Sequence, residues 1–350
     1  MNANITSKEI KTEVVDESFR DKWNLYLRNQ PYSIAWHSWD WHHVVIKQFP
    51  HQFFPLAALR ADSIIGVFPL YRLDYGKHRN ALISVPFAVA GGIVADTPEI
   101  ENLLLKESIN LSKTIGTEKI VMKQYKRRIE GDLRTDDTYF NRELSLKAGP
   151  DTLWNNLNDK NRELIRLAQK DNLTLQFPCN DLALFYKLVF RHHHRMGIPC
   201  VSKKYVSDLV DSKMYSTAVI YSNSKPLAAT MVKEYKKSIS FPFSAQYYDN
   251  DQCKRALYKL YWDLIKNYCD KGFEIFHSGR MPANEDVPEY RLGWGGEQHN
   301  YYYQYYPNTT LATESSKKRG WKRTLFTNAW KSLPGFIANS VSPFVIKNFP

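Results

Sequence analysis

Several polar side chains follow segments that read as buried strands, where ligand clefts commonly form. Arg280 comes shortly after the strand-like segment 273–277, and its planar guanidinium can bind a phosphate or carboxylate through two hydrogen bonds. A salt bridge that joins two domains is the structural alternative for this arginine. Ser278 and Ser244 also stand at strand ends. Their hydroxyl groups can donate to a developing oxyanion, although serine is common at such positions.

Basic residues recur at every fourth position in the segment 159–171, at Arg162, Arg166 and Lys170. This spacing places three cations on one face of a helix. A solvated helix face is the ordinary interpretation, and a strip that contacts phosphate groups is the functional alternative.

The triplet His192-His193-His194 does not predict a metal site. Successive residues of a helix point about 100° apart, so the three rings cannot converge on one ion. The four cysteines are widely spaced and never form a C-x-x-C pair, which indicates reduced core thiols rather than zinc ligands or disulfides. The sequence therefore predicts neither a metal nor a bound cofactor.

One series of predicted strands and a helix occurs twice in the sequence, and these elements must position the candidate residues named above. Its order is strand, strand, strand, amphipathic helix, strand, and the first copy covers 54–60, 64–73, 81–86, 99–115 and 119–125. The second copy covers 216–221, 227–234, 238–243, 252–269 and 273–277. A repeated order of this kind predicts a duplicated α/β unit.

The breaker pair Gly149-Pro150 separates a strand-like segment from the next helical one and suggests a domain boundary. We expect an N-terminal half at 1–149 and a C-terminal half at 150–312. A basic, aromatic tail at 313–350 should follow the second half.

The segment that begins at Phe273, FEIFHSGRMPANEDVPEYRLGWGG, resembles the closing motif of Fem-type peptidoglycan-bridge aminoacyltransferases. The shared features are Gly279-Arg280 after a strand, the aromatic–basic pair Tyr290-Arg291, and Trp294-Gly295. Three further stretches resemble the same group: LISVPFAVAGGIVAD (82–96), NRELIRLAQKDNL (161–173) and RHHHRMGIP (191–199). Because these stretches span nearly the whole chain, they point to the superfamily of Fem-type and GNAT-like N-acyltransferases.

This resemblance implies an α/β (α+β) fold of two tandem GNAT-like domains. It implies an enzyme that transfers an aminoacyl or acyl group to an amine of a cell-envelope saccharide precursor, in peptidoglycan or a surface polysaccharide. The implied donor is an aminoacyl-tRNA, an acyl-CoA or an acyl carrier, and the implied acceptor is a nucleotide- or lipid-linked saccharide. The alternative is a catalytically inactive, Fem-like saccharide-binding module in a polysaccharide assembly complex.

Amine attack on an activated ester requires positioning and oxyanion stabilisation but no covalent enzyme intermediate, so the absence of a nucleophile motif is compatible with catalysis. The expected catalytic residues are Arg280, Ser278 and Ser244. The residues expected to bind substrate are Tyr290, Arg291, Arg195, Arg162 and Arg166, with one of the neighbouring histidines as an alternative to Arg195. Tyr290 can stack on a base or an acyl chain. The structural alternative makes Tyr290 a core residue and Arg291 a surface residue.

The chain departs from acetyl-CoA-dependent GNAT enzymes at the loop that binds pyrophosphate. Their R-x-x-G-x-G motif opens the helix after the third strand, because backbone N–H groups at a helix start bind phosphate. Neither DTPE (96–99) nor DQCKR (251–255) fits this motif. The departure disfavours free acetyl-CoA and favours an aminoacyl-tRNA or a carrier-bound donor.

The composition is that of a globular protein, with 43% hydrophobic and 14% aromatic residues in 350. The net charge of +12 is concentrated in the tail, where 317–350 contains seven basic and no acidic residues. The rest of the chain is only mildly basic, which weakens a nucleic-acid interpretation.

The N-terminal residues lack the charged and apolar regions of a secretory signal. The apolar, uncharged stretch 81–95 contains Pro86, Gly91 and Gly92 and is too short for a membrane helix. We therefore expect a cytoplasmic protein. Its tail carries aromatic residues among cations and either lies on anionic lipid at the inner face of the membrane or packs on the protein's own surface.

Overall fold

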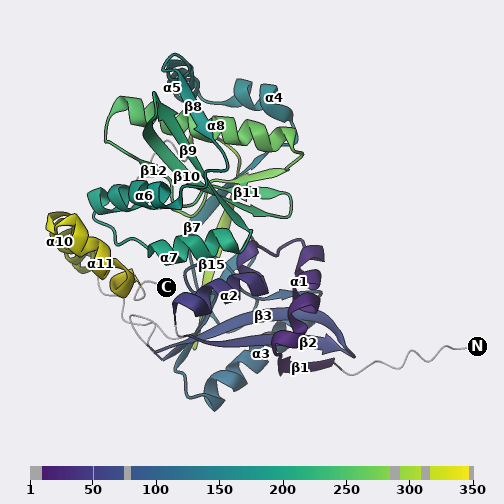
Figure 1. Ribbon diagram of the computed structural model, residues 1–350. Coiled ribbons are helices and arrows are strands. Elements are labelled where there is room, and N and C mark those ends of the chain that lie inside the picture. The colour runs from purple at the N-terminus through teal and green to yellow at the C-terminus, as the bar shows by residue number, and fades with distance from the viewer. Residues whose placement is uncertain (1–9, 50, 75–79, 284–291, 309–315, 347–350) are drawn as a thin grey trace, which may run out of the picture. The chain divides into compact units, whose positions relative to one another are not determined.

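A computed structural model describes residues 10–49, 51–74, 80–283, 292–308 and 316–346, and only the backbone of 316–323 (Figure 1). The described chain divides into two compact units. Unit 1 holds residues up to Thr138 together with Asn300–Asn308, and unit 2 holds Tyr139–His299 and the residues from Ser316 onward. In the part of the chain that the structure describes, no helix has the length and apolar character needed to cross a bilayer.

Unit 1 contains a six-stranded mixed sheet. Its strands lie in the order β1 (Ile10–Val14), β2 (Gln52–Arg60), β3 (Ser63–Leu73), β4 (Ala81–Ser84), β6 (Lys119–Tyr125) and β15 (Glu297–Tyr306). The short β5 (Val94–Ala95) pairs with β3. Every pairing is antiparallel except that of β4 with β6, which is parallel.

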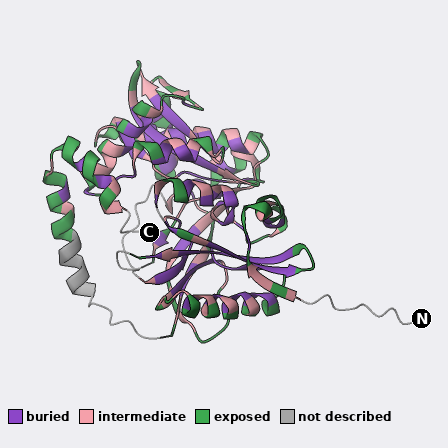
Figure 2. Cartoon of the chain, turned by 60° about the horizontal axis from the view of Figure 1, so that its bottom comes forward, coloured by how far each residue is buried: buried purple, intermediate pink, exposed green. Residues whose placement is uncertain are grey.

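Helices cover both faces of this sheet because the side chains of its strands alternate between two apolar clusters. Leu56 and Phe68 pack with Leu104 of α3 (Pro98–Thr114) on one face. Ala57 and Val67 pack with aromatic residues from the opposite layer, which contains η1 (Glu17–Phe19), α1 (Arg20–Asn29), η2 (Ala35–His37) and α2 (Trp39–Gln48). Figure 2 shows the buried residues concentrated in the strands and on the inner helix faces.

Unit 2 repeats this arrangement. Its sheet has the order β8 (Leu173–Gln176), β9 (Tyr215–Ser222), β10 (Lys225–Tyr235), β11 (Ser238–Ser240), β13 (Ile275–His277) and β7 (Arg134–Ser145). The short β12 (Ala245–Gln246) pairs with β10, and β14 (Met281–Pro282) pairs with β7. Only β11 and β13 are parallel among these pairs.

The helices of unit 2 also form two layers (Figure 1). One layer contains α4 (Gly149–Asn156), α5 (Asp159–Gln169) and α8 (Asp251–Asp270), whose apolar side chains form the main core with β9 and β10. The other contains α6 (Leu182–Met196) and α7 (Lys203–Asp211). Two C-terminal helices, α10 (Ser316–Ser332) and α11 (Gly335–Ile346), pack against α6.

The predicted duplication of the α/β unit is confirmed, since both sheets have the same order, directions and crossover helix. The strand that completes each sheet is exchanged, however. β7 follows β6 in the sequence but pairs with β13, whereas β15 follows unit 2 and pairs with β6. The predicted halves, 1–149 and 150–312, and the predicted tail, 313–350, stay predictions. In the structure, residues 139–148 lie in unit 2 and Asn300–Asn308 lie in unit 1.

The parallel strands β4 and β6 of unit 1 separate beyond Ile83, and a loop of unit 1 fills the space between them. Past this point β5 pairs with β3, while β6 stays paired with β15. The loop between β4 and β5 occupies the space, and Val85 and Ala90 are fully buried there. The buried Lys123 donates from Nζ to the carbonyl oxygens of Val85 (3.3 Å) and Ala88 (3.0 Å). Lys123 therefore holds the filling loop in place.

We predict that Lys123→Met destabilises unit 1, because two buried carbonyl groups lose a charged donor. The free energy of unfolding should fall by about 1.5–3 kcal/mol, which urea titration can measure. Lys106→Met, on an exposed position of α3, is the matched control and should change little. Equal losses in the two variants would contradict the assigned role of Lys123.

Candidate functional site

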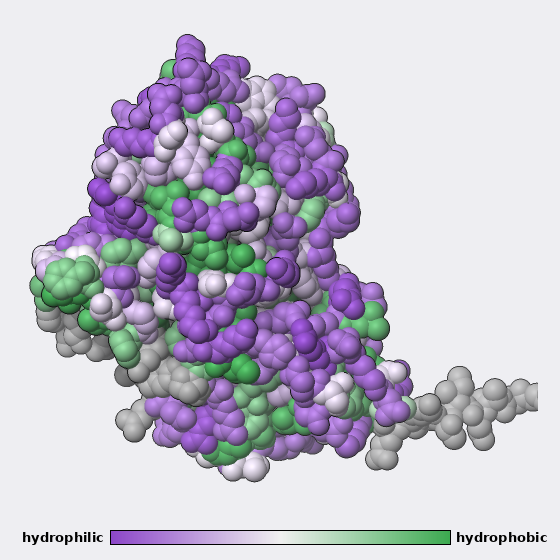
Figure 3. Space-filling view, in the orientation of Figure 1, coloured by the Kyte–Doolittle hydropathy of each residue, from purple (hydrophilic) through white to green (hydrophobic). Residues whose placement is uncertain are grey.

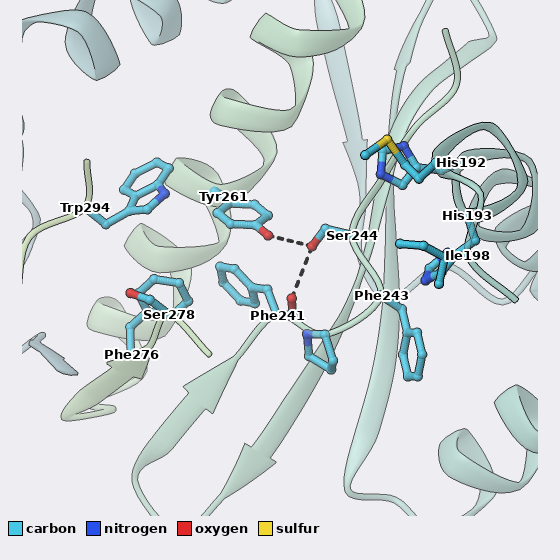
Figure 4. Close-up of a pocket in the computed structure, with 12 residues that line it drawn as sticks. His192, His193, Ile198, Phe241, Phe243, Ser244, Tyr261, Phe276, Ser278 and Trp294 are labelled. Atoms are coloured by element: carbon cyan, nitrogen blue, oxygen red, sulfur yellow. Dashed lines mark hydrogen bonds between the residues drawn. The ribbon is translucent and has the colours of Figure 1, made fainter. Parts of the chain in front are cut away.

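The corresponding opening in unit 2 contains a cavity. β11 and β13 run parallel as far as the pair Ser240 and His277, after which β12 pairs with β10 and β14 pairs with β7. β11 and β13 must diverge here because the chain beyond each of them pairs with a different strand, β10 on one side and β7 on the other. A cavity of about 310 Å³ lies in the opening, between the segment 241–244 on one side and Phe276 and Ser278 on the other. Side chains from α6 and α8 complete its lining (Figure 4).

Ser244 is held in a small hydrogen-bonded network at the cavity wall. Its Oγ donates to the carbonyl oxygen of Phe241 (3.1 Å) and lies 2.5 Å from the Tyr261 hydroxyl (Figure 4). It also lies 2.7 Å from the Thr230 hydroxyl. A serine hydroxyl has one proton and two lone pairs, so these three partners use its full capacity. The network fixes the segment 241–244, in which Phe243 has a left-handed backbone (φ 55°).

Ser278, on the opposite wall, differs from Ser244 in its hydrogen bonding. Its Oγ is buried, and no described residue forms a hydrogen bond with it. A buried hydroxyl without a partner costs about 1–3 kcal/mol. A ligand oxygen in the cavity would satisfy this group, so Ser278 is the hydroxyl available to a substrate.

His193 presents a basic nitrogen to the same cavity. Its Nδ1 lies 2.9 Å from the carbonyl oxygen of Val189. Because a carbonyl can only accept, Nδ1 carries the proton and Nε2 keeps its lone pair. Burial lowers the pKa of His193 from its ordinary 6.5, so the imidazole stays neutral.

The neighbouring His192 has the opposite proton arrangement. Its Nδ1 accepts from the guanidinium of Arg195 (3.1 Å) and from the backbone N–H of Gln246 (3.4 Å). Burial lowers the pKa of His192 to about 4, which also keeps this ring neutral. His192 and His193 are therefore adjacent on α6 but have different tautomers.

Aromatic rings form the apolar part of the lining. The ring centroids of Tyr261 and Trp294 are 5.8 Å apart, and those of Phe241 and Phe276 are 4.8 Å apart. Trp294 belongs to the Trp-Gly pair of the closing motif, so this part of the motif contributes directly to the cavity. Such surfaces suit an acyl chain, an amino acid side chain or a sugar face.

The structure brings Ser244 and Ser278 together in one cavity, but Arg280 and Arg195 are not among its lining residues. Arg280 is exposed two residues beyond Ser278, and its guanidinium lies over the Tyr139 ring at 4.7 Å. Arg195 donates to the carbonyl oxygens of Gln246 and Tyr247, each at 3.2 Å, and so braces β12. The binding and catalytic roles of both arginines stay predictions.

The remaining predicted residues lie elsewhere. On α5, Arg162 pairs with Asp159 and donates to the carbonyl oxygen of Asn155, whereas Arg166 lies over the Trp154 ring at 5.7 Å. Neither lines the cavity. Tyr290 and Arg291 fall outside the described residues.

Two cavity residues were not singled out from the sequence. Tyr261 follows the apolar period of its helix and reads as a core residue, although its hydroxyl contacts Ser244. His193 stands in the triplet 192–194, of which the sequence predicts one ring as an alternative to Arg195 in the acceptor pocket, without indicating which ring; His192 and His193 line the cavity. Within the described ranges, no group of three or more acidic, histidine or cysteine side chains is arranged to hold a metal ion.

Comparison with known proteins shows the fold. No family model and no curated protein sequence matches the chain. Among solved structures, FemX matches with a TM-score of 0.66 at 11% identity, over 84% of this chain and 96% of FemX. L-PGS from Bacillus licheniformis matches with a TM-score of 0.57 at 12% identity, over 92% and 99% of the two chains.

A tandem GNAT protein from the clavulanic acid biosynthesis pathway also matches, with a TM-score of 0.52 at 9% identity, over 85% of this chain and 98% of that protein. The predicted fold class, two tandem GNAT-like units, is therefore confirmed. The predicted likeness to Fem-type proteins is confirmed at the level of the fold.

The two cavity serines should respond differently to removal of the hydroxyl. Ser244→Ala should lower the free energy of unfolding by about 1 kcal/mol or more, because its network is lost. Ser278→Ala should leave the free energy of unfolding unchanged or raise it slightly, because it removes an unsatisfied group. Urea titration of both variants checks this. A larger loss in Ser278→Ala than in Ser244→Ala would contradict the hydrogen bonding described for the cavity.

Proposed function

We propose that the protein is an N-acyltransferase or aminoacyltransferase whose reaction takes place in the cavity of unit 2. One observation carries the proposal. A neutral histidine whose Nε2 keeps its lone pair and a buried hydroxyl that no described residue hydrogen-bonds line one cavity, where the parallel strands of a GNAT-like unit diverge. The fold shared with FemX and with a tandem GNAT protein supports this reaction class.

The residues suit each step of acyl transfer to an amine. Nε2 of His193 takes the proton that the attacking amine must lose, and the amine nitrogen forms a bond to the donor carbonyl carbon. The carbonyl oxygen becomes negatively charged and accepts a hydrogen bond from Ser278. When the bond to the leaving group breaks, the protonated His193 returns the proton to that group. No covalent intermediate with the protein forms.

The starts of the two crossover helices support a donor other than free acyl-CoA. α8 begins at Asp251, and its first-turn N–H of Cys253 already donates to the Asn250 side chain. α3 begins at Pro98, which has no N–H, and carries Glu99 and Glu101 in its first turn. Carboxylates at a helix start repel a pyrophosphate that would otherwise bind there. The proposed donor is therefore an aminoacyl-tRNA or an acyl carrier.

The proposed acceptor is an amine on a nucleotide- or lipid-linked saccharide precursor of the cell envelope. The closing motif that resembles Fem-type enzymes supports this choice, and Trp294 of that motif lines the cavity. The Tyr261 and Trp294 rings can stack on a sugar face.

The test incubates the protein with charged tRNA, acyl-CoA and acyl-carrier donors in the presence of nucleotide-sugar or lipid-linked acceptors, followed by mass spectrometry. Transfer from charged tRNA or a carrier is expected. Tight saccharide binding without transfer from any donor would show that the protein is a catalytically inactive saccharide-binding module and not an enzyme. Transfer from acyl-CoA alone would contradict the proposed donor.

His193→Gln should lower kcat roughly a hundredfold or more, which is the usual contribution of a general base. The wild-type enzyme should lose activity on acidification only below pH 6.5, because burial lowers the pKa of His193. This acidic limb should disappear in the variant. His194→Gln is the matched control, since His194 contacts the Leu333 carbonyl rather than the cavity. An unchanged pH profile in His193→Gln would show that another group takes the proton.

Arg280→Ala should reduce transfer while leaving the fold intact, because we propose that this exposed guanidinium binds an anionic part of the donor or acceptor. Loss of a charge-assisted hydrogen bond costs about 1.5–3 kcal/mol, roughly a tenfold to hundredfold effect on kcat/KM. Arg280→Lys should restore little, because it lacks the planar fork. A lower melting temperature with normal turnover would make Arg280 a structural residue instead.

A further inference from the structure

Helix α11 has the reverse of the amphipathic pattern found on helices of globular proteins. Its buried residues are the small Ala338 and Ser342, both fully covered. Its largest apolar side chains point outward, and Phe336 and Phe344 are 76% and 67% exposed. Since burial of phenylalanine is favourable by about 1.5–3 kcal/mol, an outward apolar face of this kind is characteristic of an interaction surface.

The outward residues form one continuous apolar face. Phe336, Ile337, Val341 and Phe344 are all exposed, and at 3.6 residues per turn they fall within an arc of about 140°. On the adjacent α10, Leu325 and Phe326 are exposed as well. Figure 3 shows hydrophobic residues gathered on this pair of helices at the left of the view.

Polar contacts fix the small face of α11 and the turn before it to unit 2, so the outward direction of the aromatic face is determined. The Tyr186 hydroxyl contacts Oδ1 of Asn339 (2.7 Å), and the N–H of Cys200 donates to the Ser342 hydroxyl (3.2 Å). In the turn between α10 and α11, Nε2 of His194 lies 3.0 Å from the Leu333 carbonyl oxygen. The helices α10 and α11 are therefore an integral part of unit 2.

The charge of this segment identifies the chemistry of the partner. The sequence from residue 317 to the end contains seven basic and no acidic residues, and α11 itself carries no charged residue. A segment that is rich in basic residues and also carries an exposed aromatic face matches a bilayer surface, where aromatic groups enter the interface and cations meet anionic headgroups. An apolar protein partner would not require this excess of positive charge.

We propose that α10 and α11 form a docking surface for a membrane that contains anionic lipid. The outward face of α11 inserts shallowly into the headgroup region, and the basic residues of α10 contribute the electrostatic attraction. Two cavity residues, Met196 and Ile198, are 50% and 49% exposed and flank Gly197, which packs against Thr327 of α10. Docking would thus place the cavity opening beside the lipid surface.

The experiment measures sedimentation of the full chain with phosphatidylcholine vesicles that contain or lack phosphatidylglycerol. The wild-type protein should bind the anionic vesicles, and added salt should weaken this binding. The double variant Phe336→Ser/Phe344→Ser should bind about tenfold more weakly or worse, because two interfacial aromatic groups are lost. Leu25→Ser removes an apolar side chain of α1 that is 54% exposed and should bind normally.

Circular dichroism and thermal melting of the double variant should match the wild type, since both phenylalanines are exposed. Equal binding by wild type and double variant, or equal binding to vesicles with and without phosphatidylglycerol, would overturn the proposal. Self-association of the wild type that the double variant abolishes, without vesicle binding, would make a second copy the occupant of this face. None of these measurements needs donor or acceptor, so their outcome is independent of the proposed transfer reaction.

Discussion

The structure of each unit depends on one constraint: two parallel neighbouring strands are each hydrogen-bonded to a different outer strand. Parallel strands need a long crossover, which α3 and α8 provide. When the outer strands draw the pair apart, the sheet must open at that point. Unit 1 fills the opening with its own loop, which a buried lysine holds. Unit 2 leaves the space as a cavity with polar groups on both walls.

Two polar groups of this cavity, the imidazole of His193 and the hydroxyl of Ser278, are unfavourable for folding. A neutral imidazole among apolar rings and a buried hydroxyl without a described partner both lower stability relative to an apolar lining. Ser244, in contrast, is fully hydrogen-bonded and shapes the wall. The cavity thus separates residues that build it from residues available to a ligand.

The C-terminal helices α10 and α11 also contain side chains in an unfavourable environment, here at the surface of the protein. The small residues and polar contacts of α11 secure it to α6 and to the segment after it, while Phe336 and Phe344 are exposed. Such an arrangement is unfavourable for the isolated chain and becomes favourable when an interface receives those side chains. Because Gly197 brings α10 against the end of α6, the outer surface and the cavity share this part of the structure.

Local pattern in the sequence was sufficient for the repeated order of elements and for Ser278 at the end of β13, because periodicity and strand ends are short-range properties. The strand predicted over 238–243 ends at Ser240 instead, so Ser244 lies beyond it. Local pattern was not sufficient for the exchange of β7 and β15, since hydrogen bonding at a sheet edge does not depend on side-chain identity. Nor did it connect His193 and Tyr261 to the serines. These residues come from α6 and α8, and only the packing of both helices around the diverging strands brings them together. The same packing leaves Arg162 and Arg166 outside the cavity.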